Sequence, residues 1–433
     1  MLTAIISPLV IFSIVGIYVA HQKKRSRKNL IKISKAKEYG THEPVHIHPL
    51  VDPGVCIGSG ACVTACPEKD ILGLVNGRAS LINSSHCIGH GACASACPVG
   101  AIKLVFGTET RGVDIPYVTP DFETNMKGIF IVGELGGMGL IKNSVTQGRE
   151  AIEYMSCMLR SAAKKRDDAL DVLIVGAGPA GISASLAALK HKLKFATIEQ
   201  EDIGGTVFQY PRHKIVMTSP MELPMHGKVK VRETSKESLL ELWMQVIDKT
   251  GLQIRTKEKM TDIKQDDDCY KVFTTKGEYL TRTIVLAIGR RGTPRKLGVQ
   301  GENLPKVSYR LLDAEQHRNQ YLLVVGGGDS AVEAAMALSD QPGNKVILSY
   351  RGEAFGRIKP MNKERLSQRV EKNTVEVMLN SNVKEISEKA VKIAVKDDLK
   401  EVPNDYVYVF AGGELPNEFL SKIGVRIDKR FGT

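Results

Sequence analysis

The chain has 433 residues, which is enough for two or three domains. Its 42% hydrophobic and 25% charged residues are typical of a globular protein and exclude global disorder. The formal net charge of +12 gives no argument for nucleic-acid binding, because eight Lys and Arg residues without an acid among them are gathered in residues 23–37.

The first twenty residues contain no charged side chain and are about as long as a membrane-spanning helix. No basic stretch precedes this run and no small-x-small cleavage site is evident, so we expect an uncleaved anchor over 2–20. A basic juxtamembrane segment and linker would follow over 21–49. Because the positive charges come after the apolar run, we expect a single-pass membrane protein with its main body in the cytoplasm. A buried or peripheral helix is the alternative.

Two twelve-residue runs, CIGSGACVTACP at 56–67 and CIGHGACASACP at 87–98, form an internal repeat. They resemble the C-x2-C-x2-C-x3-C-P run of two-cluster bacterial ferredoxins, in which the last cysteine ligates the other cluster. The resemblance implies a small α+β ferredoxin-like domain over 50–106. Six of the eight cysteines fall in these runs, and such clustering favours metal or cluster ligation over disulfides.

The second cysteine of each run is replaced, by Ser59 in the first and by His90 in the second. The crossed pattern implies two sets of thiolates, namely Cys56, Cys62 and Cys97 for one cluster and Cys66, Cys87 and Cys93 for the other. Three thiolates can hold a [3Fe-4S] cluster, or a [4Fe-4S] cluster whose fourth iron takes another ligand. His90 offers an imidazole nitrogen, whereas Ser59 could bind only as an alkoxide. A ferredoxin fold without clusters, or one with zinc, is the alternative.

Residues 128–133 predict a strand and residues 143–158 an amphipathic helix. This stretch resembles the last strand and helix of the flavin domain in thioredoxin reductases, where an acid approaches the flavin's ribityl chain and phosphate. Gly133 and Glu134 occupy that place here, with glutamate for the usual aspartate. Since the segment normally ends the domain, we expect a circular permutation that places 113–160 ahead of the rest. An unrelated linker is the alternative.

A dinucleotide-binding unit is predicted over 171–199, where an apolar run leads into G-x-G-x-x-G, a helix and a second strand that ends on an acid. The three glycines allow a tight turn, close approach of the backbone to a pyrophosphate, and packing of helix on strand. The acid can accept from a ribose hydroxyl. The candidate residues are Gly176, Gly178, Pro179, Ala180, Gly181 and Glu199.

From residue 171 onward the order of motifs is similar to that of thioredoxin reductases. The resemblance implies an FAD-binding domain over 170–292, an NAD(P)-binding domain over 293–405 and a return to the FAD domain over 406–433. Gly205 matches a glycine near the flavin. The second nucleotide would meet Gly326, Gly328, Asp329, Ser330 and Arg351. Glycines replace two further arginines of the 2′-phosphate site, so NADPH is favoured only slightly over NADH, with Arg357 as a substitute arginine.

The redox-active dithiol of thioredoxin reductases has no counterpart here. Their two cysteines precede the second glycine-rich turn, where this chain has VSYRLLD at 307–313, with Arg310 and Asp313 at the two places. The remaining thiols, Cys157 and Cys269, belong to no motif. Disulfide reduction is therefore disfavoured.

We accordingly expect an α/β protein with two Rossmann-like domains, a ferredoxin-like domain and one transmembrane helix. The resemblances imply an NAD(P)H-dependent oxidoreductase in which FAD and two iron-sulfur clusters pass electrons to a partner protein or membrane carrier, in either direction, without a catalytic side chain. A homodimer is compatible with this interpretation. The alternatives are a thioredoxin reductase-like or bacillithiol-type disulfide reductase, an electron-input subunit of a larger complex, or a non-enzymatic redox sensor.

Overall fold

The computed structural model describes most of the chain. The residues outside the description are 1, 39–41, 45–46, 88, 110–111, 137–138, 162–165, 213, 291, 356–357, 397 and 433.

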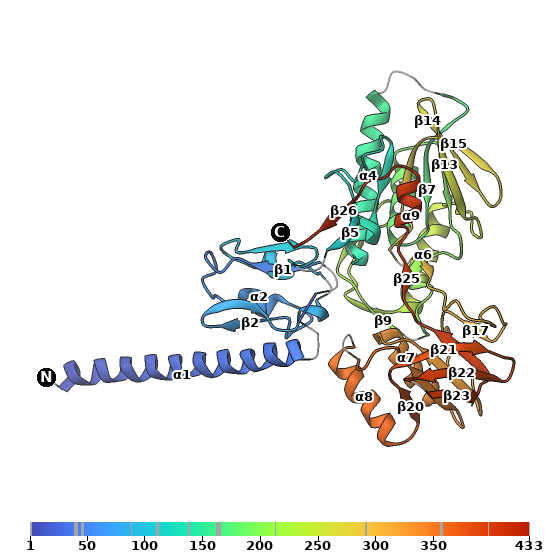
Figure 1. Ribbon diagram of the computed structural model, residues 1–433. Helices are drawn as coiled ribbons and strands as arrows, with labels where there is room; N and C mark the ends of the chain where they lie inside the picture. The colour runs from blue at the N-terminus through green and yellow to red at the C-terminus, as the bar shows by residue number, and fades with distance from the viewer. Residues whose placement is uncertain are drawn as a thin grey trace. The chain divides into compact units, whose positions relative to one another are not determined.

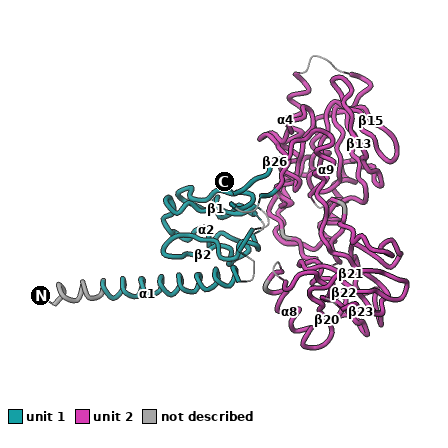
Figure 2. The backbone as a smooth tube through the Cα atoms, viewed as in Figure 1, with its two compact units in different colours: residues 1–113, 429–433 teal, residues 114–428 magenta. Residues whose placement is uncertain are grey.

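Two compact units make up the protein (Figure 2). Unit 1 comprises Met1–Val113 and Lys429–Thr433, and unit 2 comprises Asp114–Asp428. The chain leaves unit 1 in β5 (Val113–Pro116) and re-enters it in β26 (Ile427–Arg430). The last residues, which we expected to return to the FAD domain, therefore belong to unit 1.

Unit 1 holds the cysteine repeat between two pairs of antiparallel strands. Its elements are α1 (Leu2–Glu38), β1 (His48–Val51), α2 (Ala61–Ala65), β2 (Leu72–Val75), β3 (Arg78–Leu81), η1 (Ser84–His86), α3 (Ala92–Ser95) and β4 (Ile102–Val105). Strand β1 pairs with β4, and β2 pairs with β3. Leu72, Leu74 and Ile102 form a small core together with Cys62 and Cys93, so the thiols lie between the strand pairs.

The helix α1 corrects the prediction of a membrane anchor. It runs unbroken from the apolar start of the chain through the basic segment, and its basic half packs on β2. There Asn29 Nδ2 donates to the Leu74 carbonyl oxygen at 2.9 Å, and Lys32 Nζ lies 2.6 Å from the Asp70 carboxylate. Nowhere in the described residues is a helix both long and apolar enough to cross a membrane. The prediction of a single-pass membrane anchor over 2–20 is therefore wrong.

The first sheet of unit 2 has six strands in the order β13-β14-β15-β7-β8, with β6 also paired to β15. These strands are β6 (Ile129–Ile131), β7 (Leu170–Val175), β8 (Phe195–Ile198), β13 (Met260–Asp266), β14 (Cys269–Thr274) and β15 (Glu278–Leu286). The helices of this part are α4 (Ile141–Ser161), α5 (Pro179–Lys190), α6 (Lys236–Thr250) and α9 (Asn417–Lys422). The strands β6, β7, β8 and the end of β15 run parallel, and their apolar residues are buried on both faces.

The two faces of this sheet are covered by different elements (Figure 1). Alternate strand residues such as Phe130 and Ile174 pack on α4 and α5, and their neighbours Ile129 and Leu173 pack on the other face with Leu420 of α9. This alternation is the period of two that a strand imposes on its side chains.

The second sheet of unit 2 is parallel, with the order β17-β24-β18-β19-β20. Its strands and helices are β17 (Val307–Ser308), β18 (Tyr321–Val325), α7 (Asp329–Ser339), β19 (Lys345–Ser349), α8 (Pro360–Glu371), β20 (Val375–Met378) and β24 (Tyr406–Val409). An antiparallel sheet of β21 (Ser381–Ile386), β22 (Ala390–Val395) and β23 (Asp398–Pro403) follows β20. Residues 406–409, which we expected to begin the return to the first domain, pair with β18 and so belong here.

Short elements complete unit 2. They are η2 (Gly133–Gly136), η3 (Gly205–Val207), β9 (Ile215–Met217), β10 (Met221–Leu223), β11 (Gly227–Val229), β12 (Glu233–Ser235), β16 (Thr293–Pro294) and β25 (Gly413–Glu414).

Candidate cofactor sites

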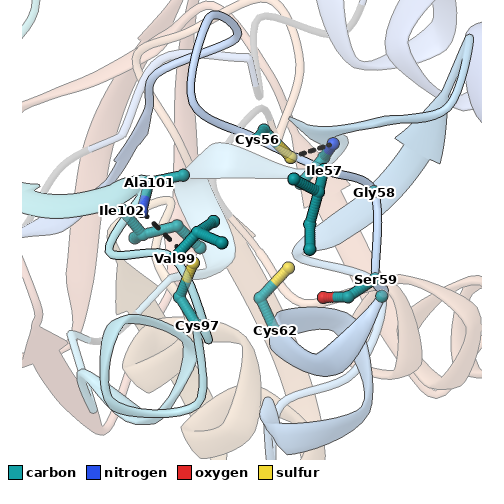
Figure 3. A pocket seen from close by; sticks show the side chains of 11 residues that line it. Cys56, Ile57, Gly58, Ser59, Cys62, Cys97, Val99, Ala101 and Ile102 are labelled. Carbon is teal, nitrogen blue, oxygen red and sulfur yellow. Dashed lines mark hydrogen bonds between the residues drawn. The ribbon is translucent and has the colours of Figure 1, made fainter.

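A first cavity in unit 1 collects three thiols from both halves of the repeat (Figure 3). Cys56 and Cys62 come from the first run and Cys97 from the second, and Ser59 lies at the cavity wall. Backbone amides donate to two of the sulfurs, from Ala79 to Cys56 at 3.4 Å and from Ala101 to Cys97 at 3.3 Å. This is the set that the crossed pattern implies.

A second cavity collects the complementary set. Cys66, Cys87 and Cys93 line it, together with His90 and Glu68. Glu68 was missed in the sequence, although a carboxylate directly after the Cys66-Pro67 pair could have drawn attention to it. Within the described part of the chain, no three His, Cys, Asp or Glu side chains lie close enough together to hold a single metal ion. The three thiols of each set instead line a cavity.

Glycines make both cavities possible. The residues at 58, 60, 89 and 91 all adopt positive φ between 72° and 81°, a region that side chains rarely enter. A Cβ on Gly58 would lie 1.9 Å from the carbonyl oxygen of Gly77, and one on Gly89 would lie 2.1 Å from Ile47. Glycine at these positions therefore lets the short loops between the cysteines close without backbone strain, and without a clash at Gly58 and Gly89.

The electrostatics of the thiols fit a cationic group in each cavity. Burial raises the pKa of Cys62 and Cys93, and it raises the pKa of Cys87 to about 11. Neighbouring thiols raise each of these pKa values further, because like charges in a small space repel. The neighbours belong to the same set, and Cys62 of the first set also acts on Cys93. Backbone amides around Cys97, that of Val99 first, lower its pKa instead. Gathered sulfur ligands of this kind suit iron of a cluster.

The first glycine-rich turn of unit 2 has the geometry of a phosphate-binding turn. Gly176 has φ 110°, and a Cβ on Gly181 would lie 1.8 Å from the Gly176 carbonyl oxygen, so helix and strand touch through backbone. Gly178 precedes α5, and Pro179 and Ala180 form its first turn. Free amides at such a helix start attract an anion. The turn also faces Gly205, where a Cβ would lie 3.0 Å from Gly178 Cα.

Glu199 lies where β8 ends, and its carboxylate is held by the backbone. Its oxygens accept from the amides of Ala177 at 2.7 Å and Glu201 at 2.9 Å, and the side chain is buried. This carboxylate therefore fixes the glycine-rich turn to the next strand, while its remaining lone pairs are available to a ribose hydroxyl.

The segment that precedes the turn in sequence meets it in space. Strand β6 pairs in parallel with β15, and a Cβ on Gly133 would lie 3.0 Å from Ala180 Cβ at the start of α5. The Gly133 amide donates to Gln147 Oε1 at 2.7 Å. Glu134 follows in η2, and its charge acts on Arg290, whose pKa is lowered by burial. Arg290 was missed, because nothing in its sequence setting shows that it is partly buried.

The second glycine-rich turn sits between β18 and α7. Gly326 has φ 150°, Gly328 precedes the helix, and Ser330 is exposed in its first turn. The Asp329 carboxylate accepts from the Lys359 amide at 2.8 Å and so joins this turn to the start of α8.

The end of β19 carries an aromatic pair beside this turn. The Tyr350 ring stacks on Phe355 at 5.4 Å and packs so closely on Gly327 that a Cβ there would lie 2.1 Å from the ring. Arg351 follows and is exposed, whereas Arg357 lies outside the described residues.

The two places of the missing dithiol are occupied by ion pairs within unit 2. Arg310 Nη1 lies 2.8 Å from Glu201 Oε2, and Asp313 Oδ2 lies 3.3 Å from Arg212 Nη1. Both partners belong to the predicted FAD domain. Hydrogen-bonded charges thus stand where a thioredoxin reductase would carry sulfur.

Comparisons with known proteins agree with this geometry. A family model described as pyridine nucleotide-disulphide oxidoreductase matches residues 173–431, and one described as a 4Fe-4S dicluster domain matches residues 48–98. Bacilliredoxin reductase Bdr of Bacillus subtilis is 27% identical over 60% of this chain and 82% of its own length. A ferredoxin–NADP reductase of Ignicoccus hospitalis is 30% identical over 59% of this chain and 82% of its own length.

A solved structure resembles the same region. The bacillithiol disulfide reductase Bdr from Staphylococcus aureus superposes with a TM-score of 0.53 and 27% identity, covering 60% of this chain and 82% of that one. The family match spans more than half of the chain. The protein therefore belongs to the pyridine nucleotide-disulphide oxidoreductase family, as an NAD(P)H-dependent flavin oxidoreductase with a 4Fe-4S dicluster domain.

Proposed function

We propose that this protein moves electrons between NAD(P)H and a redox partner protein, with FAD and two iron-sulfur clusters as its cofactors. A flavin exchanges electrons in pairs with a nicotinamide and singly with a cluster, which makes it the link between the two kinds of site. The observation that carries the proposal is that the six repeat thiols gather into two cavities, in a chain that also carries two glycine-rich turns, each leading into a helix.

The residues proposed to hold FAD come from both sides of the expected permutation. The turn of Gly176, Gly178 and Gly181 would bind the pyrophosphate, and Glu199 the ribose. We assign residues 113–160 to the same domain, because β6 extends its sheet and α4 packs on α5. Gly133 and Glu134 would then approach the flavin, as the corresponding residues of thioredoxin reductases do.

The nucleotide proposed for the second turn is NADPH. Gly326, Gly328, Asp329 and Ser330 would face its phosphates, and exposed Arg351 would face the 2′-phosphate. No carboxylate stands at the end of β19, where Ser349 leads into Tyr350, so the described residues offer no ribose partner of the kind that favours NADH. The ferredoxin–NADP reductase among the relatives is consistent with this choice.

Disulfide reduction is the second candidate, since one relative is named a bacilliredoxin reductase and one similar structure a bacillithiol disulfide reductase. The ion pairs of Arg310 and Asp313 speak against a dithiol mechanism at the place known from thioredoxin reductases.

An anaerobic titration tests the proposal. The purified full chain is assayed for iron, sulfide and flavin, and then reduced with NADPH or NADH while visible absorbance follows the flavin and electron paramagnetic resonance follows the clusters. We expect NADPH to bleach the flavin and to reduce at least one cluster. If dithionite reduces the clusters but neither nucleotide does, the proposed path is absent.

Matched variants sharpen this test. Cys87→Ala removes a thiol from the second cavity, and Cys157→Ala removes an exposed thiol of unit 2 that lines neither cavity. The first should lose iron and leave flavin bleaching intact, whereas the second should behave like the parent chain. Equal loss of iron in both would show that the cavities do not hold it.

A further inference from the structure

The two thiol cavities differ in what stands at the place of the missing cysteine. At the first, Ser59 is exposed, and its hydroxyl oxygen accepts from the Ala61 amide at 3.5 Å. The other described residues of this cavity that are not cysteine are glycine, alanine, valine or isoleucine. The first cavity therefore offers three thiols and one neutral hydroxyl.

The second cavity carries two stronger donors. His90 stands at the missing cysteine and Glu68 on the wall formed by the other half of the repeat, and both are partly buried. The charge of Glu68 acts on His90 as well as on Cys66 and Cys87, which places the carboxylate among these groups. A nitrogen ligand and a carboxylate thus face the same space as three thiols.

These donors differ in how readily they bind iron. A neutral imidazole binds through a lone pair without losing a proton, and histidine ligates iron in known iron-sulfur centres. A serine hydroxyl must first lose a proton whose pKa is far above neutrality, and the hydroxyl of Ser59 already has a backbone partner. Among the described residues that line it, the first cavity therefore has no competent fourth ligand, whereas the second has His90.

We propose that the cavities hold clusters of different composition. A [3Fe-4S] cluster occupies the cavity of Cys56, Cys62 and Cys97, and a [4Fe-4S] cluster occupies that of Cys66, Cys87 and Cys93, with His90 bound to its fourth iron. The inference rests on the proposed function only in requiring that both cavities bind clusters.

Electron counting makes the difference measurable. An oxidised [3Fe-4S] cluster has an odd number of electrons and gives a paramagnetic signal, whereas an oxidised [4Fe-4S] cluster of the ferredoxin type has an even number and gives none. The experiment purifies the full chain anaerobically, counts iron and sulfide, and records electron paramagnetic resonance of the oxidised state and after dithionite. We expect about seven iron atoms and about one oxidised-state spin per chain.

Two substitutions separate the cavities. Ser59→Cys should raise the iron to about eight and abolish the oxidised signal, because the first cavity gains its fourth thiolate. His90→Ala should lower the iron to about six and roughly double that signal. His90→Cys should restore about seven iron atoms and the parent signal, which distinguishes ligation from a general effect on folding.

Three results would overturn the inference. They are eight iron atoms without an oxidised signal in the parent chain, a signal that survives Ser59→Cys, and iron and spin unchanged in His90→Ala. A signal that survives Ser59→Cys would come from a damaged cluster in the cavity of Cys66, Cys87 and Cys93. Dithionite bypasses the nucleotide and flavin sites, so a chain that fails to accept electrons from NADPH still gives a decisive result. A chain without iron would instead refute the proposed function.

Discussion

Replacing Gly148 by alanine should destabilise the FAD domain and weaken its hold on FAD. Gly148 lies in the middle of α4 at the point where that helix crosses α5, and it is buried. A Cβ there would lie 2.2 Å from the carbonyl oxygen of Ala180, 3.0 Å from its carbonyl carbon and 3.1 Å from the amide nitrogen of Ala184. All three atoms are backbone, so no side chain can rotate away.

The magnitude follows from two opposing effects. Alanine in a helix interior is favoured over glycine by about 1 kcal/mol, so the change would stabilise an isolated α4. The Cβ is about 1 Å closer to backbone than a non-bonded contact permits, and overpacking of this kind costs roughly 1–3 kcal/mol or more. Because the clash is with backbone that cannot rotate away, the upper part of that range applies, and we expect a net loss of about 1–2 kcal/mol, or roughly 2–8 °C in the unfolding midpoint.

The same displacement should reach the flavin site. Ala180 also touches the position of Gly133, so moving α4 away from α5 shifts the relocated segment against the glycine-rich turn. Thermal unfolding and the FAD content of the purified variant measure both effects. Gly136→Ala is the control, since a Cβ there meets no atom within 4 Å. A Gly148→Ala variant as stable as the parent chain and with full FAD would refute the close helix crossing and the assignment of residues 113–160 to this domain.

Three further outcomes are expected in unit 2. Arg310→Glu should slow flavin reduction by NADPH about 1.4- to fivefold, because an ion pair of this exposure is worth about 0.2–1 kcal/mol, and the added Glu201→Arg should restore the rate in stopped-flow measurements. Gly205→Ala should retain about tenfold less FAD and should also unfold at a lower temperature than the parent chain, since it adds a Cβ at φ 56° and 3.0 Å from Gly178 Cα. Burial raises the pKa of Tyr408 from 10.0, its ordinary value, to about 12. The stability that its neutral phenol contributes to the folded state is therefore complete below pH 10 and is lost as the pH rises to 12. Urea unfolding should lose up to about 3 kcal/mol over that interval, and a Tyr408→Phe variant that loses as much would contradict this.

The cluster cavities could be predicted from sequence because their information is local. Spacing within each run sets the loop, and the resemblance to two-cluster ferredoxins implies the crossing of Cys66 and Cys97. The structure places both thiols with the opposite run. The first glycine-rich turn was equally predictable, since Gly176 and Gly181 meet backbone only a few residues away.

Features that depend on distant partners could not be predicted in this way. An uncharged run of twenty residues suggested a membrane span, but the helix continues into a basic half whose Asn29 bonds to Leu74, 45 residues away. The apolar run at 406–409 fits any parallel sheet, and only its pairing with β18 decides which one. Glu68 reaches its cavity beside Cys66, but no ligand of the cysteine run stands at its place, so the pattern of the run did not assign it.

The ion pairs of Arg310 and Asp313 hold the segment that would carry the dithiol in a thioredoxin reductase. A dithiol must approach both the flavin and its substrate, so its segment has to stay free of strong contacts to the rest of the chain. Here the same segment joins Glu201 and Arg212 by charge, and Lys214 Nζ adds a contact of 2.5 Å to Glu333 of α7. Each pair is partly exposed and weak alone. The three pairs all join residues 201–214 to residues 310–333, so together they resist the separation of these two parts of unit 2. In the proposed function, electrons that enter at the flavin need an acceptor other than a dithiol at this place, and iron-sulfur clusters held by the six repeat thiols of unit 1 would provide it.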